Sequence, residues 1–496
     1  MVMKTYEKNY RPFTAICGCD FGRQMILTDQ ERIDASNIVE ELNKALSIHT
    51  QNKCEIEYLD RYYRGDQPII YRHKKNRPEI NNRVVINLAK FVVDTLTAES
   101  VSEPIQYVLR EVDESKTDEI KQLNTYLLSE AKDYHDTELV RNQHIYGTAY
   151  RFIGRNDEFV EGEDDSPFYL TDENPADAFV CYFSNSKKPA FSCQARNDVN
   201  GNQVYNVYTR SEYFLISGGS IIASDVNGNG RIPLIEYPRN SRRLSDIEVT
   251  IMMTDEINKL ASDRSNAIEG FVSSWIKFIN CEIDIEKFRE VREEGFFSVT
   301  SNNGAENKSD VDIMSNELNQ TDAQVADDDL FDKLLMIHGI ANREINTGGD
   351  TGSAVYQRNG GAEGERRAEL DEPIFKRSER EMLRIILNML RVKEGFNLMA
   401  TDIEIKITRS KLDNALNKAE VLQILLNCGI APARAIKTVE LFSDPEQVAS
   451  ESKKWLDIKY PDNTNVGQTE SQPTTAETPS VDTTEVGIDG KEGSEL

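Results

Sequence analysis

The sequence lacks any apolar run approaching the ~18 residues that a membrane-spanning helix needs. Its start, MVMKTYEKNYRPF, also lacks the apolar core of a signal peptide. With glycine counted in place of tyrosine, the apolar share is roughly 40%, below the ~45–50% of ordinary globular chains. We therefore expect a protein of the cytoplasm, or of an assembly built there, much of whose surface faces water or copies of itself.

Cysteine pairs and metal-binding spacings are missing too. The seven cysteines are scattered, no Cys-x-x-Cys occurs, and no histidine lies near Cys17 and Cys19 to complete a zinc site. The five histidines show no His-x-x-x-His spacing. Asp327, Asp328 and Asp329 point about 100° apart on a helix, so we expect them to interact with a helix dipole and not with metal. We expect reduced thiols, no metal and no cofactor.

The sequence has no lysine where a nucleotide-binding loop would need one. The stretch INTGGDTGSAVYQRNGG, residues 345–361, holds five glycines, but it lacks the lysine of the Gly-x-x-x-x-Gly-Lys-Ser/Thr pattern and follows a helical segment. We interpret it as a mobile connector between long helices, because glycine lowers the barrier to rearrangement. Gly-x-Ser-x-Gly is absent as well, and no catalytic group is identified.

Positive charge is outnumbered, with 58 lysine and arginine residues against 85 aspartate and glutamate residues. The formal net charge is −27, and residues 457–496 carry nine acidic and two basic residues among few large apolar ones. We expect that segment to be a disordered acidic tail. So acidic a chain repels DNA at long range, which suits a protein that touches DNA without holding it. One basic cluster could contact phosphates, although a solvated hairpin tip is favoured; it comprises Arg72, His73, Lys74, Lys75, Arg77 and Arg83.

One stretch matches the calcium-loop pattern. It is DVNGNGRIPLIE, in which the ligand positions are Asp225, Asn227, Asn229 and Glu236, with Gly230 at the turn. Strand-like segments flank it, and Asn-Gly between two strands is a hairpin signal. We therefore favour a hairpin turn and keep calcium as the weaker alternative.

The first half of the chain predicts helices and then a sheet. Apolar spacing indicates a helix within residues 28–65, with Thr28 and Asp29 as candidate caps, and a buried helix over 87–96. Residues 124–240 alternate in the β manner between turn clusters. They predict one meandering, mostly antiparallel sheet.

The second half predicts long helices around a small insert. Ser245 and Glu248 form a capping box that opens a helix over 245–279, roughly 50 Å long. A single narrow apolar stripe on so long a helix implies long packing partners. A β-rich insert, a second helix over 319–345 and the glycine-rich loop come next. The remaining elements are a helix to Gly395 bent at Pro373, a strand over 402–408 and three short helical pieces.

Local stretches in this order resemble the portal proteins of tailed double-stranded-DNA bacteriophages, of the siphophage type. YLDRYYRGDQPI and NNRVVINLAKFVVDTLTAESVSEPIQY look like the N-terminal block of that family, and YGTAYRFI, NPADAFVCYF and GRIPLIEYPRN look like its strands. DTGSAVYQ is similar to the stretch after its second stem helix, and residues 402–451 resemble its C-terminal domain. The similarity spans roughly residues 50–456.

The resemblance implies an α+β, elongated portal fold that is divided along the chain. Its parts would be an N-terminal arm (1–27), a β-rich and helical wing (28–244), two stem helices (245–279 and 319–345), a small α/β clip insert (280–318), a tunnel loop (346–361), a long bent helix (362–394), a helical crown (395–456) and the acidic tail (457–496). Residues 1–27 and the tail have no family counterpart that we assign.

The resemblance also implies a function and its residues. Such proteins form a ring, commonly of twelve subunits, at one capsid vertex of the virion, assembled in the host cytoplasm. DNA would pass the tunnel loop without sequence preference, along Asn346, Thr347, Gly348, Gly349, Asp350, Thr351, Gly352, Ser353 and Arg358. The clip would dock partners through Glu286, Arg289, Glu290, Arg292, Glu293, Asn302 and Asn303.

The partners implied are the large subunit of the packaging terminase, then head-completion or adaptor proteins, with the major capsid and scaffolding proteins around the ring. The portal itself would hydrolyse nothing. Two alternatives stay open: a packaging ATPase-nuclease, for which the phosphate-binding lysine is missing, and an acidic scaffold or adaptor of low oligomeric order.

Overall fold

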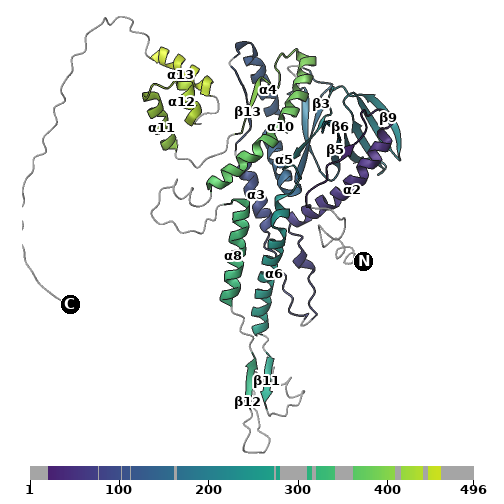
Figure 1. Cartoon of the computed structure of the whole chain (residues 1–496), viewed down its shortest axis with the longest axis vertical. Coiled ribbons are helices and arrows are strands. Elements are labelled where there is room, and N and C mark those ends of the chain that lie inside the picture. Colours follow the sequence, from purple (N-terminus) through teal and green to yellow (C-terminus); the bar gives the residue numbers. More distant parts are fainter. Residues whose placement is uncertain are drawn as a thin grey trace, which may run out of the picture. The chain divides into compact units, whose positions relative to one another are not determined.

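The computed structural model describes residues 21–75, 78–101, 103–111, 113–160, 165–272, 275–279, 310–314, 320–340, 361–407, 415–439 and 445–459. Contacts divide the chain into two compact units, residues 1–421 and 422–496. Helices and sheets are both present, which confirms the mixed α and β character (Figure 1).

Helix α2 (Ile38–Tyr63) opens the first unit. The predicted caps Thr28 and Asp29 are wrong, because Leu27–Thr28 forms the short strand β1, which pairs in parallel with β5. The predicted end is confirmed: Gly65 follows the helix with a φ of +93°, a conformation that favours glycine. The buried helix is confirmed as α3 (Leu88–Ser100).

Two helices occupy the start of the region predicted as strands. They are α4 (Thr117–Ser129) and α5 (Lys132–Tyr146), so the β prediction from residue 124 to 146 is wrong. The physical reason is visible in α5, whose buried positions include Asp136, Gln143 and His144. A helix that buries polar groups shows no clear apolar period in its sequence.

Strands follow, but in two main sheets where one was predicted. The meander is confirmed for β5 (Ala178–Phe183), β6 (Pro189–Asn197), β7 (Gln203–Tyr208), β8 (Glu212–Ser217) and β9 (Ser220–Val226), which lie in sequence order beside β1. A separate sheet has the order β10–β3–β4, from Leu234–Pro238, Thr148–Arg155 and Phe168–Glu173. Because β9 and β10 belong to different sheets, the hairpin predicted between them is wrong.

The two long helices after the sheets are α6 (Asp246–Val272) and α8 (Gln320–His338), which lie side by side (Figure 1). The capping box is confirmed, since Ser245 N–H donates to Glu248 Oε2 at 2.7 Å. The helix predicted over 245–279 is wrong at its end, where β11 (Trp275–Ile279) pairs antiparallel with β12 (Asp310–Met314). Aromatic and β-branched residues favour that strand.

Helix α10 (Gly361–Glu394) is the third long helix after the sheets, and it contains Pro373. Gly395, with a φ of +75°, follows its end as predicted. The predicted strand at 402–408 is β13 (Ile403–Lys406), and it pairs antiparallel with β2 (Gln106–Leu109). Two short 3-10 helices, η1 (Pro68–Tyr71) and η2 (Glu114–Lys116), connect these elements.

The three predicted C-terminal helical pieces are confirmed. Helix α11 (Ala415–Asn427) spans the boundary between the units, and the second unit holds α12 (Pro432–Val439) and α13 (Pro445–Lys459). Helices α12 and α13 pack against each other. The predicted disordered tail lies outside the described residues from 460 onward.

A buried charge cluster joins α10 to the three-stranded sheet. Arg151 of β3 is fully buried, and its guanidinium lies 2.8 Å from Asp136 of α5 and 3.2 Å from Asp172 of β4. Glu379 of α10 pairs with Lys132 at 2.8 Å. Buried ion pairs stabilise the fold only when every charge is paired, because an unpaired buried charge is strongly destabilising.

Candidate functional site

The candidate site lies where α6, α8 and α10 meet α3 and α5. On one side, apolar side chains of α3, α6 and α8 form a single buried cluster, which includes Leu88, Val92, Leu96, Ile257, Leu334 and Leu335. Arg264 of α6 and Asp327 of α8 form an ion pair at 3.5 Å. Asp327 to Asp329 therefore lie along the body of α8, and the predicted role at a helix N-terminus is wrong.

Residues 82–86 form an extended segment that lies along α6 and is held there by three polar side chains of that helix. Three of its backbone N–H groups donate to α6: Asn82 to Asn266 Oδ1 at 2.6 Å, Val84 to Ser262 Oγ at 2.9 Å, and Ile86 to Asn258 Oδ1 at 2.7 Å. The three acceptors are spaced four residues apart, so they share one face of the helix. The sequence does not predict these three acceptors, because their role is evident only from the segment that they bind.

Part of the predicted basic cluster is paired within the chain. Arg72 forms an ion pair with Asp263 of α6 at 2.7 Å, and Arg83 Nη1 donates to the carbonyl of Ile70 at 2.7 Å. His73 and Lys75 are exposed, and Arg77 lies outside the described residues. The first contact attaches Arg72 to α6, and the second attaches Arg83 to the 3-10 helix η1.

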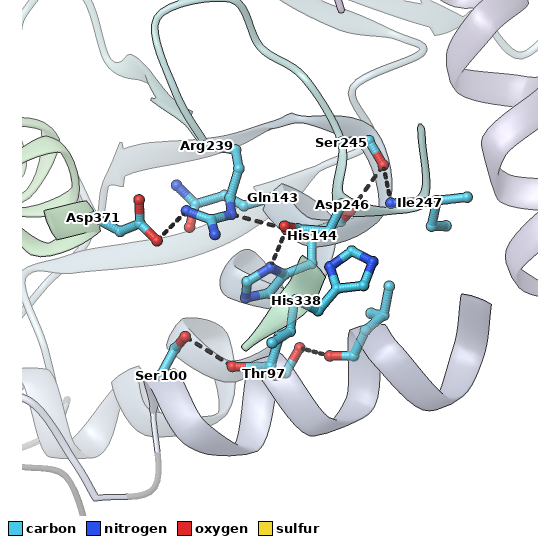
Figure 2. A network of polar contacts seen from close by, with 12 residues as sticks. Thr97, Ser100, Gln143, His144, Arg239, Ser245, Asp246, Ile247, His338 and Asp371 are labelled. Atoms are coloured by element: carbon cyan, nitrogen blue, oxygen red, sulfur yellow. Dashed lines mark hydrogen bonds and ion pairs between the residues drawn. The ribbon is translucent and has the colours of Figure 1, made fainter. Parts of the chain in front are cut away.

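A buried polar network marks the start of α6 (Figure 2). Asp246 receives His144 Nδ1 of α5 at 2.6 Å and Arg239 Nε at 2.9 Å, while Arg239 Nη1 reaches Asp371 of α10 at 2.6 Å. Burial raises the pKa of Asp246, but Arg239 and His144 outweigh it and hold that pKa well below its usual range. The network ties the first turn of α6 to α5 and α10.

The ends of α8 and α10 are joined directly. Arg367, near the start of α10, donates to the carbonyl of His338, the last residue of α8, and pairs with Glu99 of α3 at 3.1 Å. Gly339 follows with a φ of +64° and ends α8. Both flanks of residues 341–360 are therefore attached to one another at the junction.

His338 is a buried base in this junction. Its Nε2 lies 2.9 Å from Thr250 Oγ1 of α6, and its exposed fraction is 3%. Burial lowers the pKa of His338 to about 4; Asp246 opposes that shift, and Arg367, His144 and Arg239 add to it. The imidazole is therefore neutral in the folded protein near neutral pH.

His338→Gln should weaken the acid sensitivity of the fold. Because the folded pKa lies below the unfolded value of ~6.5, the unfolded state binds the extra proton and stability falls as pH drops from about 6.5 towards 4. Between pH 7 and 4.5 this residue accounts for roughly 2 kcal/mol. Thermal unfolding measured across that range checks the slope.

The matched control is His73→Gln, which changes an exposed histidine. It should leave the pH slope of the melting temperature as in the wild type. An unchanged slope in the His338 variant would contradict the assignment of a neutral buried base.

The residues of the calcium-loop pattern have other partners. Glu236 lies on β10, where Arg243 Nη2 approaches its Oε2 at 2.8 Å and Thr148 Oγ1 donates to its Oε1 at 3.0 Å. Asn227 donates to the carbonyls of Thr209 and Arg231, each at 2.7 Å. Within the described ranges no group of three or more acidic, histidine or cysteine side chains is placed to hold a metal ion.

The other predicted site residues are not described. All of the tunnel-loop residues from Asn346 to Arg358 and all of the clip residues from Glu286 to Asn303 lie outside the described residues. In the part of the chain that is described, no helix is long and apolar enough to cross a bilayer.

Comparison with protein families decides the identity. The model of the family "Phage portal protein, SPP1 Gp6-like" matches residues 42–461, which is most of the chain. The chain belongs to this portal family. It therefore has a portal function at the capsid vertex, and the predicted resemblance is confirmed.

Two solved structures are also similar to the portal chain. One is a chain from the neck of an empty gene transfer agent particle (TM-score 0.43, 11% identity, 71% of this chain and 90% of that chain). The other is from the virion of a native gene transfer agent particle (TM-score 0.43, 12% identity, 78% and 94%). No curated protein matches the portal chain in sequence. The portal protein family is structural.

Proposed function

We propose that copies of this portal chain close into a ring, commonly of twelve, in the virion. The observation that carries the proposal is the exposed apolar surface of the paired long helices. Val249 and Met252 of α6 are 46% and 74% exposed, and Val325 and Met336 of α8 are 62% and 73% exposed. Val325 and Met336 are eleven residues apart, about three helical turns, so they share one face of α8.

These four exposed side chains do not belong to the apolar stripe that the sequence predicts on the helix beginning at Ser245. The predicted apolar stripe of this helix includes Ile247, Ile251 and Ile257, which are buried within the chain against α2, α3, α5 and α8. The exposed apolar residues are therefore left for a neighbouring subunit. A head-to-tail interface forms a closed ring when its rotation divides a full turn, and the proposed portal ring requires this.

In this ring the stem comprises α6 and α8, and residues 346–361 form the tunnel loop that faces double-stranded DNA. The contact between Arg367 and His338 joins the two helices on either side of that loop, which supports a fixed base for it. The net charge of −27 supports passage without tight binding, because few counterions are released. The protein contributes no hydrolysis and needs no cofactor.

The remaining regions serve attachment. The clip, residues 280–318, docks the terminase large subunit and later the head-completion or adaptor proteins, and the major capsid and scaffolding proteins surround the ring. The division into arm, wing, stem, clip, loop, crown and tail follows the family resemblance. The ring assembles in the host cytoplasm and remains in the virion.

The ring is tested with the double variant Met252→Glu and Met336→Glu. Each change removes apolar area worth about 1.5–3 kcal/mol on burial and introduces a charge, so assembly should weaken by far more than tenfold in dissociation constant. Mass photometry and negative-stain images should show wild-type rings with a central hole and smaller species for the variant.

Met399→Glu is the matched control. Met399 is 55% exposed and lies outside the long helices, and its variant should assemble as the wild type does. A wild-type chain that stays single at high concentration would refute the ring itself. Rings formed normally by the double variant would instead refute the role of this surface.

A further inference from the structure

A cavity in the first unit gathers positive charge from separate segments of the chain. It has a volume of about 530 Å³, and seven cationic side chains line it against two acidic ones. The cations come mainly from the β5–β6 turn, the β7–β8 turn, the connection between β9 and β10, and helix α10; they include Lys187, Lys188, Arg210, Arg231, Arg377 and Arg384. In a chain with a net charge of −27, composition alone does not explain this concentration.

The two carboxylates neutralise only part of that charge. Glu236 is buried and paired with Arg243, the seventh cation. Glu381 contacts Arg384 and lies 3.7 Å from Arg231. The cavity is therefore left with a surplus of five positive charges.

Four of the cations are open to solvent and have no counter-charge. Lys187, Lys188, Arg210 and Arg377 are exposed, and their side chains make no ion pair or hydrogen bond to another described residue. Like charges that a fold holds together in a hollow focus the potential there and attract anions. The cavity is therefore placed to bind an anion that enters from solvent.

The rest of the lining and the volume limit the class of anion. Apolar side chains of Ile232, Leu234, Ile374 and Ile385 also line the cavity. Pockets of about 300–1,000 Å³ with apolar walls and a few polar groups hold small molecules. The space is too small to admit a DNA duplex, whose major groove alone is ~12 Å wide.

We propose that this cavity binds a small polyphosphate, whether inorganic or attached to a nucleoside. A single carboxylate would leave most of the surplus charge unbalanced, whereas one terminal phosphate group carries about −1.5 to −2 charges at pH 7 and three acceptor oxygens. Arginine binds phosphate oxygens in pairs, and lysine adds a point charge. The apolar wall would hold the base of a nucleotide. The ligand is bound and not hydrolysed, and the inference does not depend on the ring.

Isothermal titration calorimetry of the full chain with inorganic tripolyphosphate tests the proposal, in ~50 mM salt and without added magnesium. We expect saturable binding at one site per chain. Raising the salt to ~0.5 M should weaken that binding at least about tenfold, because the contacts are between charges. A second arm uses ATP: tighter binding than tripolyphosphate would show that the apolar wall holds the base, and equal binding would show that the phosphate chain is sufficient.

Lysine acetylation locates the ligand on the wild-type protein. Saturating tripolyphosphate should slow the acetylation of Lys187 and Lys188 at least about fivefold, because their amines would contact phosphate. Lys121, which is exposed and does not line the cavity, should react within about twofold of its rate without ligand.

A pair of neutral variants separates the cavity from general attraction. Arg210→Gln with Arg377→Gln removes two of the four cations without a counter-charge and should weaken tripolyphosphate binding at least about tenfold. The matched control is Arg110→Gln with Arg380→Gln, which removes the same charge from two exposed arginines outside the cavity. It should leave the affinity within about twofold.

Three outcomes would overturn the proposal. One is that tripolyphosphate and ATP both fail to bind at millimolar concentration. Another is that they bind but leave the acetylation of Lys187 and Lys188 unchanged. The third is that a short DNA duplex protects both lysines, loses affinity in the Arg210 and Arg377 variant and is not displaced by tripolyphosphate. The rim of the cavity would then bind nucleic acid and not a small polyphosphate.

Discussion

Arg151→Met is expected to lower the stability of the first unit by about 3–5 kcal/mol, which corresponds to a fall in melting temperature of ~4–6 °C for a unit of this size. The variant keeps much of the side-chain volume but removes the guanidinium. Asp136 at 2.8 Å and Asp172 at 3.2 Å then stay buried with less compensation. Glu379 of the same cluster depends on Lys132 and on the hydroxyl of Tyr237, at 2.8 Å each.

Calorimetry or circular dichroism during heating measures the effect. Arg64→Met is the matched control, because its ion pair with Asp60 is solvent-exposed and such pairs contribute about 0–1 kcal/mol. Equal melting temperatures for the two variants would mean that the buried cluster is not a determinant of stability. The cluster also joins α10 to α5 and the three-stranded sheet, through Glu379 with Lys132 and with Tyr237.

Gly348→Pro combined with Gly349→Pro should block DNA packaging and leave ring assembly intact. Proline fixes φ near −65°, whereas glycine permits both signs of φ, so the pair removes the freedom that a loop needs to follow passing DNA. Complementation of a portal-deficient phage, with nuclease-protected DNA counted per particle, measures packaging. The expected loss is at least about a hundredfold, because a single blocked conduit stops the whole genome.

Gly348→Ala with Gly349→Ala provides the control, since alanine adds a side chain without closing a ring on the backbone. This variant should package more DNA than the proline variant. Loss of rings in the proline variant, seen by negative stain, would show that the loop serves assembly. Normal packaging would show that its glycines have no part in DNA passage.

The sequence predicted the elements whose evidence is local. The capping box at Ser245 and Glu248, the glycine ends at Gly65 and Gly395, and the β5–β9 meander all depend on neighbours a few residues apart. The order of these elements was enough to predict the portal family, which the family match confirms.

Other features could not be read from a local pattern. Strand β3 is buried on both faces, so its sequence does not alternate between apolar and polar residues. The sequence therefore did not indicate that Arg151 would be fully buried. In the sequence, one face of α6 reads as an ordinary polar face, formed by Asn258, Ser262 and Asn266. In the structure, these residues bind the segment from Asn82 to Ile86.

The junction around Asp246 includes residues that are far apart in the chain. His144 and Asp371 come from α5 and α10, and nothing in their local sequence marks them as partners of Asp246 or Arg239. The same holds for Arg367 and His338, which are in contact although they belong to different helices.

The sequence alone thus determined the class of protein, the positions of the long helices and the acidic balance, because periodicity, caps and charge are properties of short segments and of composition. Only the tertiary structure decided which polar side chains are buried together, where unpaired cations gather and which apolar residues remain exposed. Those properties arise from contacts between different helices and strands, where the cost of burying a charge is offset by a partner that the local sequence does not identify.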